Sequence, residues 1–438
     1  MVDGFDVKQP PLNVPALKAS DFRPLKLLGK GGQGTVLLVE HKVTGSVHAL
    51  KVMAKYPERA EDKENRMYEE QAILRSLALS PREQTSCLLD FEASFHDNAH
   101  FFFLTGYSPR GDLWTEIERY KTTGMPENMI LGYAAEIVHI LSVLHSFFVL
   151  HRDFKPDNIL IDARGHLLLA DFGISRAFEL PPDARPWVKD EPSASLKLNL
   201  QKRKNYLRKL VRAQLSARHM TLNVCGTPGF VAPEVYRGPA YSYGADVWAA
   251  GVIIYKMAFG KLPFGLTKKM EMQDRVKQTC LSPLEFPEDG RRTVSAEFKD
   301  LLSQMLEKDP SKRPQAKDLK SHPYFAVIPW DAIARREGSG PGAHAHAAPK
   351  KADKKITIPE GTLYPPGEDP APWMDWMTAA FRDKLVSKQT QAQQDGSLGV
   401  AAPTMPRSRS FGLIQRCRSL WKLSASQRSL NAGVEVES

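Results

Sequence analysis

The stretch His151-Arg152-Asp153-Phe154-Lys155-Pro156-Asp157-Asn158 places a carboxylate, a cation and a carboxamide within six residues. Transfer of a phosphoryl group to an alcohol needs a carboxylate that orients the hydroxyl and accepts its proton. It also needs a positive charge near the moving phosphoryl group and oxygen ligands for Mg²⁺. Asp153, Lys155 and Asn158 can supply these three groups. The stretch therefore predicts a phosphoryl-transfer site.

A second carboxylate follows eighteen residues after Asp153, in Asp171-Phe172-Gly173. It would bind Mg²⁺ that bridges nucleotide phosphates. Between the two carboxylates, residues 159–162 and 167–169 are apolar and indicate a short β-hairpin. Such a hairpin would bring Asn158 and Asp171 together.

A glycine-rich string, Gly29-Lys30-Gly31-Gly32-Gln33-Gly34-Thr35-Val36, fits the pattern GxGxxGxV. Glycines let backbone N–H groups approach phosphate oxygens without an intervening side chain. Alone the pattern is weak, because dinucleotide-binding proteins use a similar string to open a helix, and a plain hairpin would also fit. Residues of β type follow here, at 36–39, which favours a strand–turn–strand flap over a nucleotide.

A lysine, Lys51, ends a predicted strand 17 residues after Gly34. It could neutralise α- and β-phosphate charge, but it needs an acidic partner to hold it in place. Glu70, on a helix predicted over 62–79, is the first candidate, and Glu69 is its rival. The alternative is a surface lysine and a solvated glutamate, the commoner state of both residue types.

Together with Ala232-Pro233-Glu234, these motifs occur in the order of the eukaryotic protein kinases, which the chain resembles over residues 22–325. The resemblance implies an α+β, bilobal protein kinase fold. A small antiparallel β-rich N-lobe with one main helix would span about 22–106, and a larger, mainly helical C-lobe about 107–325. ATP and Mg²⁺ would be the cofactors.

The resemblance also implies roles for individual residues. Asp153, Lys155, Lys51 and Glu70 would be catalytic, and Asn158 and Asp171 would bind metal. Asp246 would hold the catalytic loop backbone, and Arg313 would form a buried ion pair with Glu234. Adenine would lie between Val36, Ala49 and Leu160, with Thr105 as gatekeeper and residues 106–108 as hinge. The nucleotide-binding set would be Gly29, Lys30, Gly31, Gly32, Gln33, Gly34, Val36, Ala49, Lys51, Thr105, Gly106, Tyr107, Ser108, Asp112 and Leu160.

Lys155 and Thr227 match the serine/threonine rather than the tyrosine pattern. Four stretches are similar to the AGC branch of the protein kinases: residues 22–30, 48–55, 321–325 and 330–333. The branch carries a C-terminal tail ending in an aromatic pair that docks on the small lobe. Here the tail would span 326–390 and the pair would be Trp373 and Trp376; the rival interpretation is a sticky patch in a disordered tail.

The activation segment departs from the family, since Asp171 and Glu234 are 63 residues apart. The excess is a basic insert, 181–222, with 10 Lys/Arg against 3 Asp/Glu, a net charge of +7. It could be a nuclear import signal, an anionic-lipid contact, an autoinhibitory arm or a solvated flexible insert. Asn223 replaces the usual activating threonine, and Lys256 replaces an acidic residue that helps basophilic relatives to bind substrate arginine.

The amino-acid composition limits the class of protein to which the chain can belong. The chain has 438 residues, 42% hydrophobic and 25% charged, which excludes a wholly disordered chain or a collagen-like fibre. Four scattered cysteines predict neither a zinc site nor a disulfide framework, and favour a reducing compartment. The apolar runs are too short for a membrane span. We expect a monomer in the cytoplasm and/or the nucleus.

The termini carry less information. Residues 1–21 are expected to be an extended lead-in, and 391–438 a basic, Ser-rich tail that is either disordered or a membrane or calmodulin contact. We therefore predict a protein serine/threonine kinase that phosphorylates Ser/Thr hydroxyls of protein substrates. The alternatives are a pseudokinase scaffold of the same fold, and a binder of an anionic partner, lipid or nucleic acid, through the insert and tail.

Overall fold

The computed structural model describes residues 16–32, 34–55, 60–178, 221, 225–238, 241–267, 269–287, 293–345, 356–365, 368–369 and 374–394, with the backbone alone at 60–66 and 392–394. Gln33, Asn223, Trp373, the basic insert apart from Thr221, and the tail beyond 394 therefore lie outside the described residues. The chain divides into two units, Met1–Gln389 and Thr390–Ser438, and the features below belong to the first, apart from residues 390–394 at the end of the last helix.

The N-lobe is built on a six-stranded sheet with the order β1-β2-β3-β5-β4-β10, in which every neighbouring pair is antiparallel. Buried residues alternate with partly buried ones along β2, so one face of the strand packs in the core. The strands are β1 (Phe22–Gly31), β2 (Gly34–His41), β3 (Val47–Ala54), β4 (Phe91–His96), β5 (His100–Thr105) and β10 (Trp376–Met377).

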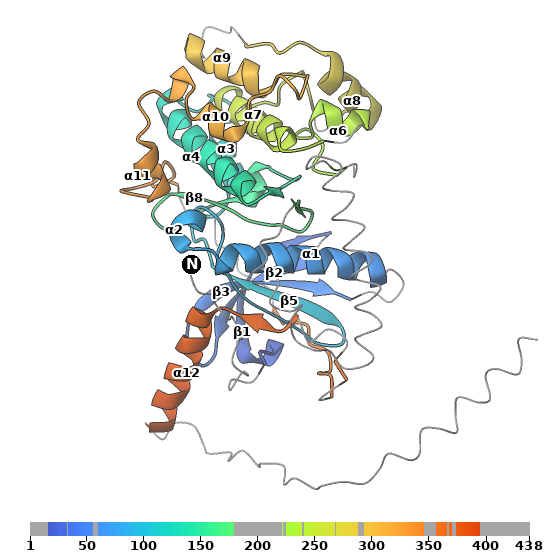
Figure 1. The fold of residues 1–438 in the computed structure, drawn as a ribbon, viewed down its shortest axis with the longest axis vertical. Helices are drawn as coiled ribbons and strands as arrows, with labels where there is room; N and C mark the ends of the chain where they lie inside the picture. Colours follow the sequence, from blue (N-terminus) through green and yellow to red (C-terminus); the bar gives the residue numbers. More distant parts are fainter. Residues whose placement is uncertain are drawn as a thin grey trace, which may run out of the picture. The chain divides into compact units, whose positions relative to one another are not determined.

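One long helix, α1 (Ala60–Leu79), accompanies this sheet, as Figure 1 shows, and the short α2 (Arg82–Thr85) follows it. On the sheet, a cluster of Phe22, Leu37, Leu50 and Phe95 is covered by Phe381 and Leu385 of α12 (Ala379–Gln394). Leu17 and Ala19 belong to the same cluster, and Ala19–Asp21 forms a 3-10 turn, η1. The described part of the lead-in, residues 16–21, is therefore packed against the sheet and not simply extended, because Leu17 and Ala19 are buried there.

The C-lobe is mainly helical, and α4 and α7 run through its core (Figure 1). Fifteen of the sixteen α7 residues are buried, as the apolar sequence predicts. The helices are α3 (Leu113–Arg119), α4 (Glu127–Ser146), α6 (Pro233–Arg237), α7 (Gly244–Phe259), α8 (Met272–Leu281), α9 (Ala296–Met305), α10 (Ala316–Leu319) and α11 (Trp330–Ala334), with 3-10 turns η3 (Pro156–Asn158) and η6 (Pro323–Phe325). Together with the antiparallel sheet, they confirm the predicted α+β bilobal fold.

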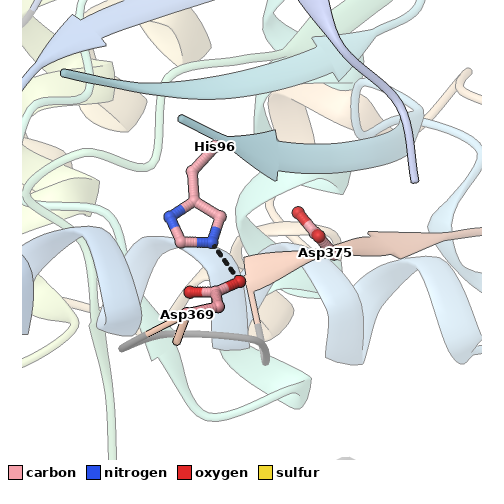
Figure 2. A group of neighbouring side chains, drawn as sticks. All are labelled: His96, Asp369 and Asp375. Carbon is pink, nitrogen blue, oxygen red and sulfur yellow. Dashed lines mark hydrogen bonds and ion pairs between the residues drawn. The ribbon is translucent and has the colours of Figure 1, made fainter. Parts of the chain in front are cut away.

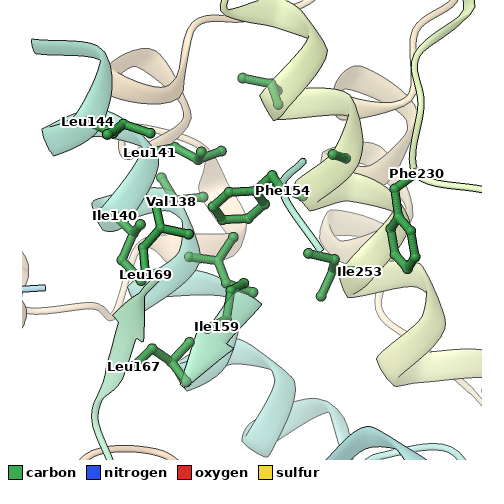
Figure 3. Close-up of a cluster of buried hydrophobic side chains, with 14 of the residues drawn as sticks. Val138, Ile140, Leu141, Leu144, Phe154, Ile159, Leu167, Leu169, Phe230 and Ile253 are labelled. Atoms are coloured by element: carbon green, nitrogen blue, oxygen red, sulfur yellow. The ribbon is translucent and has the colours of Figure 1, made fainter. Parts of the chain in front are cut away.

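Two short pairs of antiparallel strands flank the predicted site residues in the chain. β7 (Ile159–Ile161) pairs with β8 (Leu167–Leu169), and β6 (Val149–Leu150) with β9 (Arg176–Ala177). Figure 3 shows Ile159, Leu167 and Leu169 packed among the side chains of α4. Because these strands are anchored in the core, the polar residues at their ends are held in place.

Among the described helices, only α4 is long and apolar enough to cross a membrane, judged by length and composition alone. The sequence prediction counted no such run. In the structure 61% of its most apolar window is buried within the protein, as in the core helix of a globular domain.

The segment after the C-lobe returns to the N-lobe sheet. Trp376 pairs with Ser94, and Met377 pairs with Ala93, so the tail adds β10 as an edge strand beside β4. Trp376 is 3% exposed and stacks on Phe91. The position of Trp376 agrees with the predicted docking of the tail.

Candidate active site

Asp153 lies at the centre of a hydrogen-bond network. Its Oδ1 accepts from the backbone N (2.9 Å) and the Oγ1 (2.6 Å) of Thr227. Its Oδ2 accepts from Lys155 Nζ (2.6 Å) and Asn158 Nδ2 (3.3 Å), and Lys155 Nζ also lies 2.8 Å from Thr227 Oγ1. The structure thus brings together Asp153, Lys155 and Asn158, and it shows that a short alcohol can bond to the carboxylate and the ammonium at once.

The loop that carries Asp153 is fixed from below by Asp246 of α7. The two carboxylate oxygens of Asp246 accept from the backbone N of His151 (2.8 Å) and of Arg152 (3.0 Å). Burial alone would raise the pKa of Asp246, but His145 at 3.0 Å and these donors lower it below its usual value. Arg152 has a φ of 68°, an uncommon backbone geometry that these bonds hold in place.

Lys51 joins the two lobes. Its Nζ lies 2.7 Å from Glu70 Oε1 and 2.9 Å from Asp171 Oδ1. Burial alone would lower the pKa of Lys51, but the two carboxylates outweigh it and raise the pKa. Likewise burial alone would raise the pKa of Asp171, and Lys51 lowers it below its usual value. Burial raises the pKa of Glu70, and Lys51 acts in the opposite direction. The shifts of Lys51 and Asp171 favour their charged forms, and the ammonium of Lys51 can bind phosphate oxygens.

The structure shows which of the two adjacent glutamates contacts Lys51. Glu70 contacts Lys51, whereas Glu69 Oε1 lies 2.8 Å from Arg176 Nη1 of β9. Helical periodicity in the sequence does not tell which of two adjacent glutamates contacts the lysine, because each of them has a basic partner in the structure. Arg176 was missed from the sequence, because no local signal links it to α1.

A backbone hydrogen bond brings together the two chain segments that carry oxygen ligands suited to Mg²⁺. Ala170 N donates to Asn158 O (2.8 Å), so Asn158 lies beside the residue that precedes Asp171. Asn158 uses its Nδ2 on Asp153, which leaves its amide oxygen for a cation. A carboxylate and an amide oxygen are hard ligands of the kind that Mg²⁺ takes. The donor set fits the metal.

The glycine-rich string forms the turn between β1 and β2. Gly34 has a φ of 148°, and a Cβ there would meet Val52 O at 2.4 Å. At Gly29, Gly31 and Gly32 a Cβ would meet nothing within 4 Å. Lys30 pairs with Thr35 across the turn. The structure therefore makes a glycine obligatory at one of the predicted phosphate-binding positions and leaves open space at three.

Two of the predicted adenine residues, Val36 and Ala49, lie on the neighbouring strands β2 and β3, and the third, Leu160, lies on β7. Val36 pairs with Lys51, and Ala49 pairs with Thr105, whose Oγ1 lies 3.5 Å from Ala49 O. Leu160 forms an isolated bridge with Asp112. Gly106 N donates to Asp90 O, Tyr107 is exposed and Ser108 is buried. Asp112 caps α3 by accepting from Thr115 N at 2.7 Å.

The predicted buried ion pair is present. Arg313 Nη1 and Nη2 lie 2.6 and 3.1 Å from the two oxygens of Glu234, and both residues are buried. A bidentate pair of this kind tolerates burial because its hydrogen bonds are satisfied. It ties the end of the activation segment to the C-lobe.

The ammonium group of Lys256 is paired within the protein. Its Nζ lies 2.9 Å from Glu118 Oε1 and 4.5 Å from the centre of the Trp114 ring. The position that was predicted to differ from basophilic relatives is thus occupied by an internal ion pair.

A polar cluster at the tail went unnoticed in the sequence. The possible ligand atoms of His96, Asp369 and Asp375 lie within 4.8 Å of one another, and Figure 2 shows the three side chains, with a hydrogen bond between His96 and Asp369. Lys55 Nζ donates to His96 Nδ1 at 2.7 Å, so Nε2 carries the proton and donates to Asp369 (3.0 Å). Because neither nitrogen has a free lone pair, we interpret the cluster as a clamp on the tail and not as a metal site.

The tail also contacts α1. Met374 O accepts from Ser94 Oγ (2.6 Å) and from Gln71 Nε2 (3.1 Å). Gln71 directly follows Glu70. The docked tail is therefore bonded to the helical turn that carries the partner of Lys51.

Comparison with known proteins gives a consistent result. A family model described as "Protein kinase domain" matches residues 22–192 and 209–325. The chain is 28% identical over 358 residues to "Serine/threonine-protein kinase Sgk1-B" of Xenopus laevis, covering 79% of this chain and 71% of that protein. It is 29% identical over 358 residues to "Serine/threonine-protein kinase Sgk1" of Rattus norvegicus (79% and 71%) and of Homo sapiens (79% and 72%).

Proposed function

Starting from the premise that the chain belongs to the protein kinase family, we propose that it transfers the γ-phosphoryl group of Mg-ATP to serine or threonine hydroxyls of protein substrates. The resemblance to AGC-like serine/threonine kinases drawn from the motifs is confirmed by the relatives. Two observations together carry the proposal: the contact of Lys51 with both Glu70 and Asp171, and the hydrogen bond that Asp153 accepts from the hydroxyl of Thr227.

Each residue of the candidate active site has its own role in the proposed phosphoryl transfer. Asp153 would orient the substrate hydroxyl and accept its proton, and Lys155 would place a positive charge near the same oxygen. Lys51, held by Glu70, would bind phosphate oxygens of the nucleotide. When bound, Mg²⁺ neutralises charge on the phosphates, and Asn158 and Asp171 would hold it. Gly34 allows the backbone turn that would face the phosphates.

Preference for short alcohols is supported by Thr227. Its hydroxyl lies within hydrogen-bond distance of Asp153 and Lys155, at 2.6 and 2.8 Å. The position therefore suits serine or threonine, whereas the phenol oxygen of tyrosine stands farther from its backbone. Phosphoamino-acid analysis of a labelled mixed substrate tests this preference, and label on tyrosine alone would overturn it.

Incorporation of phosphate from γ-labelled ATP into a generic protein substrate tests the function. Wild type should incorporate label, and Asp153→Asn should lose about 10²- to 10⁴-fold, the usual contribution of a positioned general base. Equal rates for the two proteins would contradict the assignment of Asp153. No incorporation by wild type would instead favour the pseudokinase alternative, which the structure gives no reason to prefer, because Lys51, Glu70, Asp153, Asn158 and Asp171 are all in place.

The remaining features of the proposal concern organisation and partners. We retain a kinase domain at 22–325, an AGC-like tail at 326–390 and a basic tail at 391–438, in a monomer of the cytoplasm and/or nucleus.

The +7 charge of insert 181–222 supports an anionic partner, lipid or nucleic acid. Deletion of the insert should abolish binding to anionic vesicles or to RNA and should spare ATP binding.

A further inference from the structure

Two neighbouring glutamates on α1 contact different parts of the molecule. Glu70 Oε1 lies 2.7 Å from Lys51 Nζ on β3, and Glu69 Oε1 lies 2.8 Å from Arg176 Nη1 on β9. Successive residues of a helix point about 100° apart, so one turn can reach two directions. The Glu69 and Arg176 side chains are 31% and 13% exposed, so water screens this pair only in part.

Arg176 is connected to the catalytic loop through the backbone. It pairs with Leu150 in the β6–β9 ladder, and Leu150 directly precedes His151. Arg152 donates from Nε to Ile174 O (2.5 Å) and from Nη2 to Ser175 O (3.3 Å), which fixes the two residues before Arg176. The guanidinium that Glu69 contacts is thus held in a constant place relative to Asp153.

We propose that the Glu69–Arg176 ion pair is a positioning contact for phosphoryl transfer, which holds α1 against β9 so that Glu70 meets Lys51. The proposal rests on the proposed function and adds a regulatory element to it. Glu69 and Arg176 are positioning residues, since they act through Glu70. An outward shift or rotation of α1 separates both ion pairs together, because both carboxylates belong to one helical turn. Glu69 supplies the negative charge from within the chain, so this link requires no phosphate.

The experiment measures kcat and the KM for ATP of the full chain after phosphatase treatment. Glu69→Gln and Arg176→Gln should each lower kcat/KM about twofold to fivefold, the range for a partly exposed ion pair. The double variant should lose no more than Arg176→Gln alone, because Glu69 acts through its contact with Arg176. In the Glu70→Gln background, Glu69→Gln should have no further effect.

Two further measurements separate positioning from simple stability. Activity of wild type should fall as salt is raised from 0.05 to about 0.5 M more steeply than activity of Glu69→Gln, since salt screens the pair. Glu337→Gln is the matched control, because Glu337 pairs with Arg335 on the exposed surface, and it should leave kcat/KM and the melting temperature unchanged.

The outcomes distinguish this inference from the function itself. If wild type incorporates no phosphate, the proposed function fails. If wild type is active but Glu69→Gln keeps full kcat/KM, the positioning inference fails. It also fails if Glu69→Gln costs the same factor with and without Glu70, because the effect would then not pass through Lys51.

Discussion

Trp376 stacks on Phe91 with ring centroids 5.1 Å apart and ring planes 7° apart. The indole also receives the guanidinium of Arg75, 5.4 Å from its ring centre, from the last turns of α1. A tail residue therefore packs between a sheet strand and the helix that carries Glu70. Because stacked aromatic pairs and cation–π contacts add to the energy of burial, this residue should dominate tail docking.

Trp376→Ala should release the tail. Loss of a buried tryptophan costs about 3–5 kcal/mol in a core, which sets the upper limit here. We expect a lower melting temperature and faster proteolysis within residues 356–377. Kinase activity should also fall, because Gln71 and Arg75 lose their contacts with the tail.

Trp376→Phe is the control, since it keeps an aromatic ring against Phe91. It should retain most of the protection from protease. Wild-type resistance in Trp376→Ala would show that the β10 pairing and the His96 clamp suffice without the indole.

The sequence predicted the chemistry well where the functional residues are close along the chain. Asp153, Lys155 and Asn158 lie within six residues, and an apolar hairpin separates them from Asp171, so local pattern was enough. It could not choose between Glu69 and Glu70, because the rotation of α1 about its axis depends on packing. It gave no sign of the His96–Asp369 contact, which joins residues 273 positions apart.

Gly34→Ala should impair the turn over the nucleotide. The new Cβ would meet the backbone oxygen of Val52 at 2.4 Å, and a φ of 148° strains any side chain. We expect a higher KM for ATP and a loss of about 1–3 kcal/mol in stability. ATP titrations and thermal melts measure both.

Gly31→Ala is the matched substitution, because a Cβ at Gly31 meets nothing within 4 Å. It should leave the melting temperature close to that of wild type. Equal melting temperatures for the two alanine variants would mean that the strand β2 relaxes around Gly34 at little cost.

Arg313→Met should strongly destabilise the C-lobe. It leaves the buried Glu234 carboxylate without its bidentate partner, which costs about 3–5 kcal/mol for a pair of this kind. Unfolding in urea measures the loss. The double variant Glu234→Leu/Arg313→Met should recover part of it, because no charge stays unpaired.

Recovery should stop short of wild type, since Arg313 also donates to Gly244 O (2.7 Å) and Glu307 O (2.8 Å). A double variant no more stable than Arg313→Met would show that these carbonyl bonds, and not the ion pair, hold the segment.

The tail clamp contains one carboxylate that is poorly compensated. Asp375 Oδ1 is buried without a hydrogen-bond partner. Burial, with repulsion from Asp369, raises the pKa of Asp375 to about 6, although His96 and Lys55 act in the opposite direction. When the tail is released, the pKa should return to about 3.9. The docked tail therefore holds a proton between about pH 4 and 6 that the released tail gives up, and docking weakens as the pH rises through this window.

Asp375→Asn should therefore stabilise the docked tail above about pH 6, where the wild-type side chain carries a buried charge, by at most about 3 kcal/mol. Below about pH 4 both forms are neutral, and the gain should vanish. Melting temperatures from pH 4 to 8 measure the difference, in which the titration of all other groups cancels. Asp383→Asn on the exposed face of α12 is the control and should show no such trend. A gain for Asp375→Asn that is constant with pH would mean that its carboxyl titrates normally and that the clamp tolerates the charge.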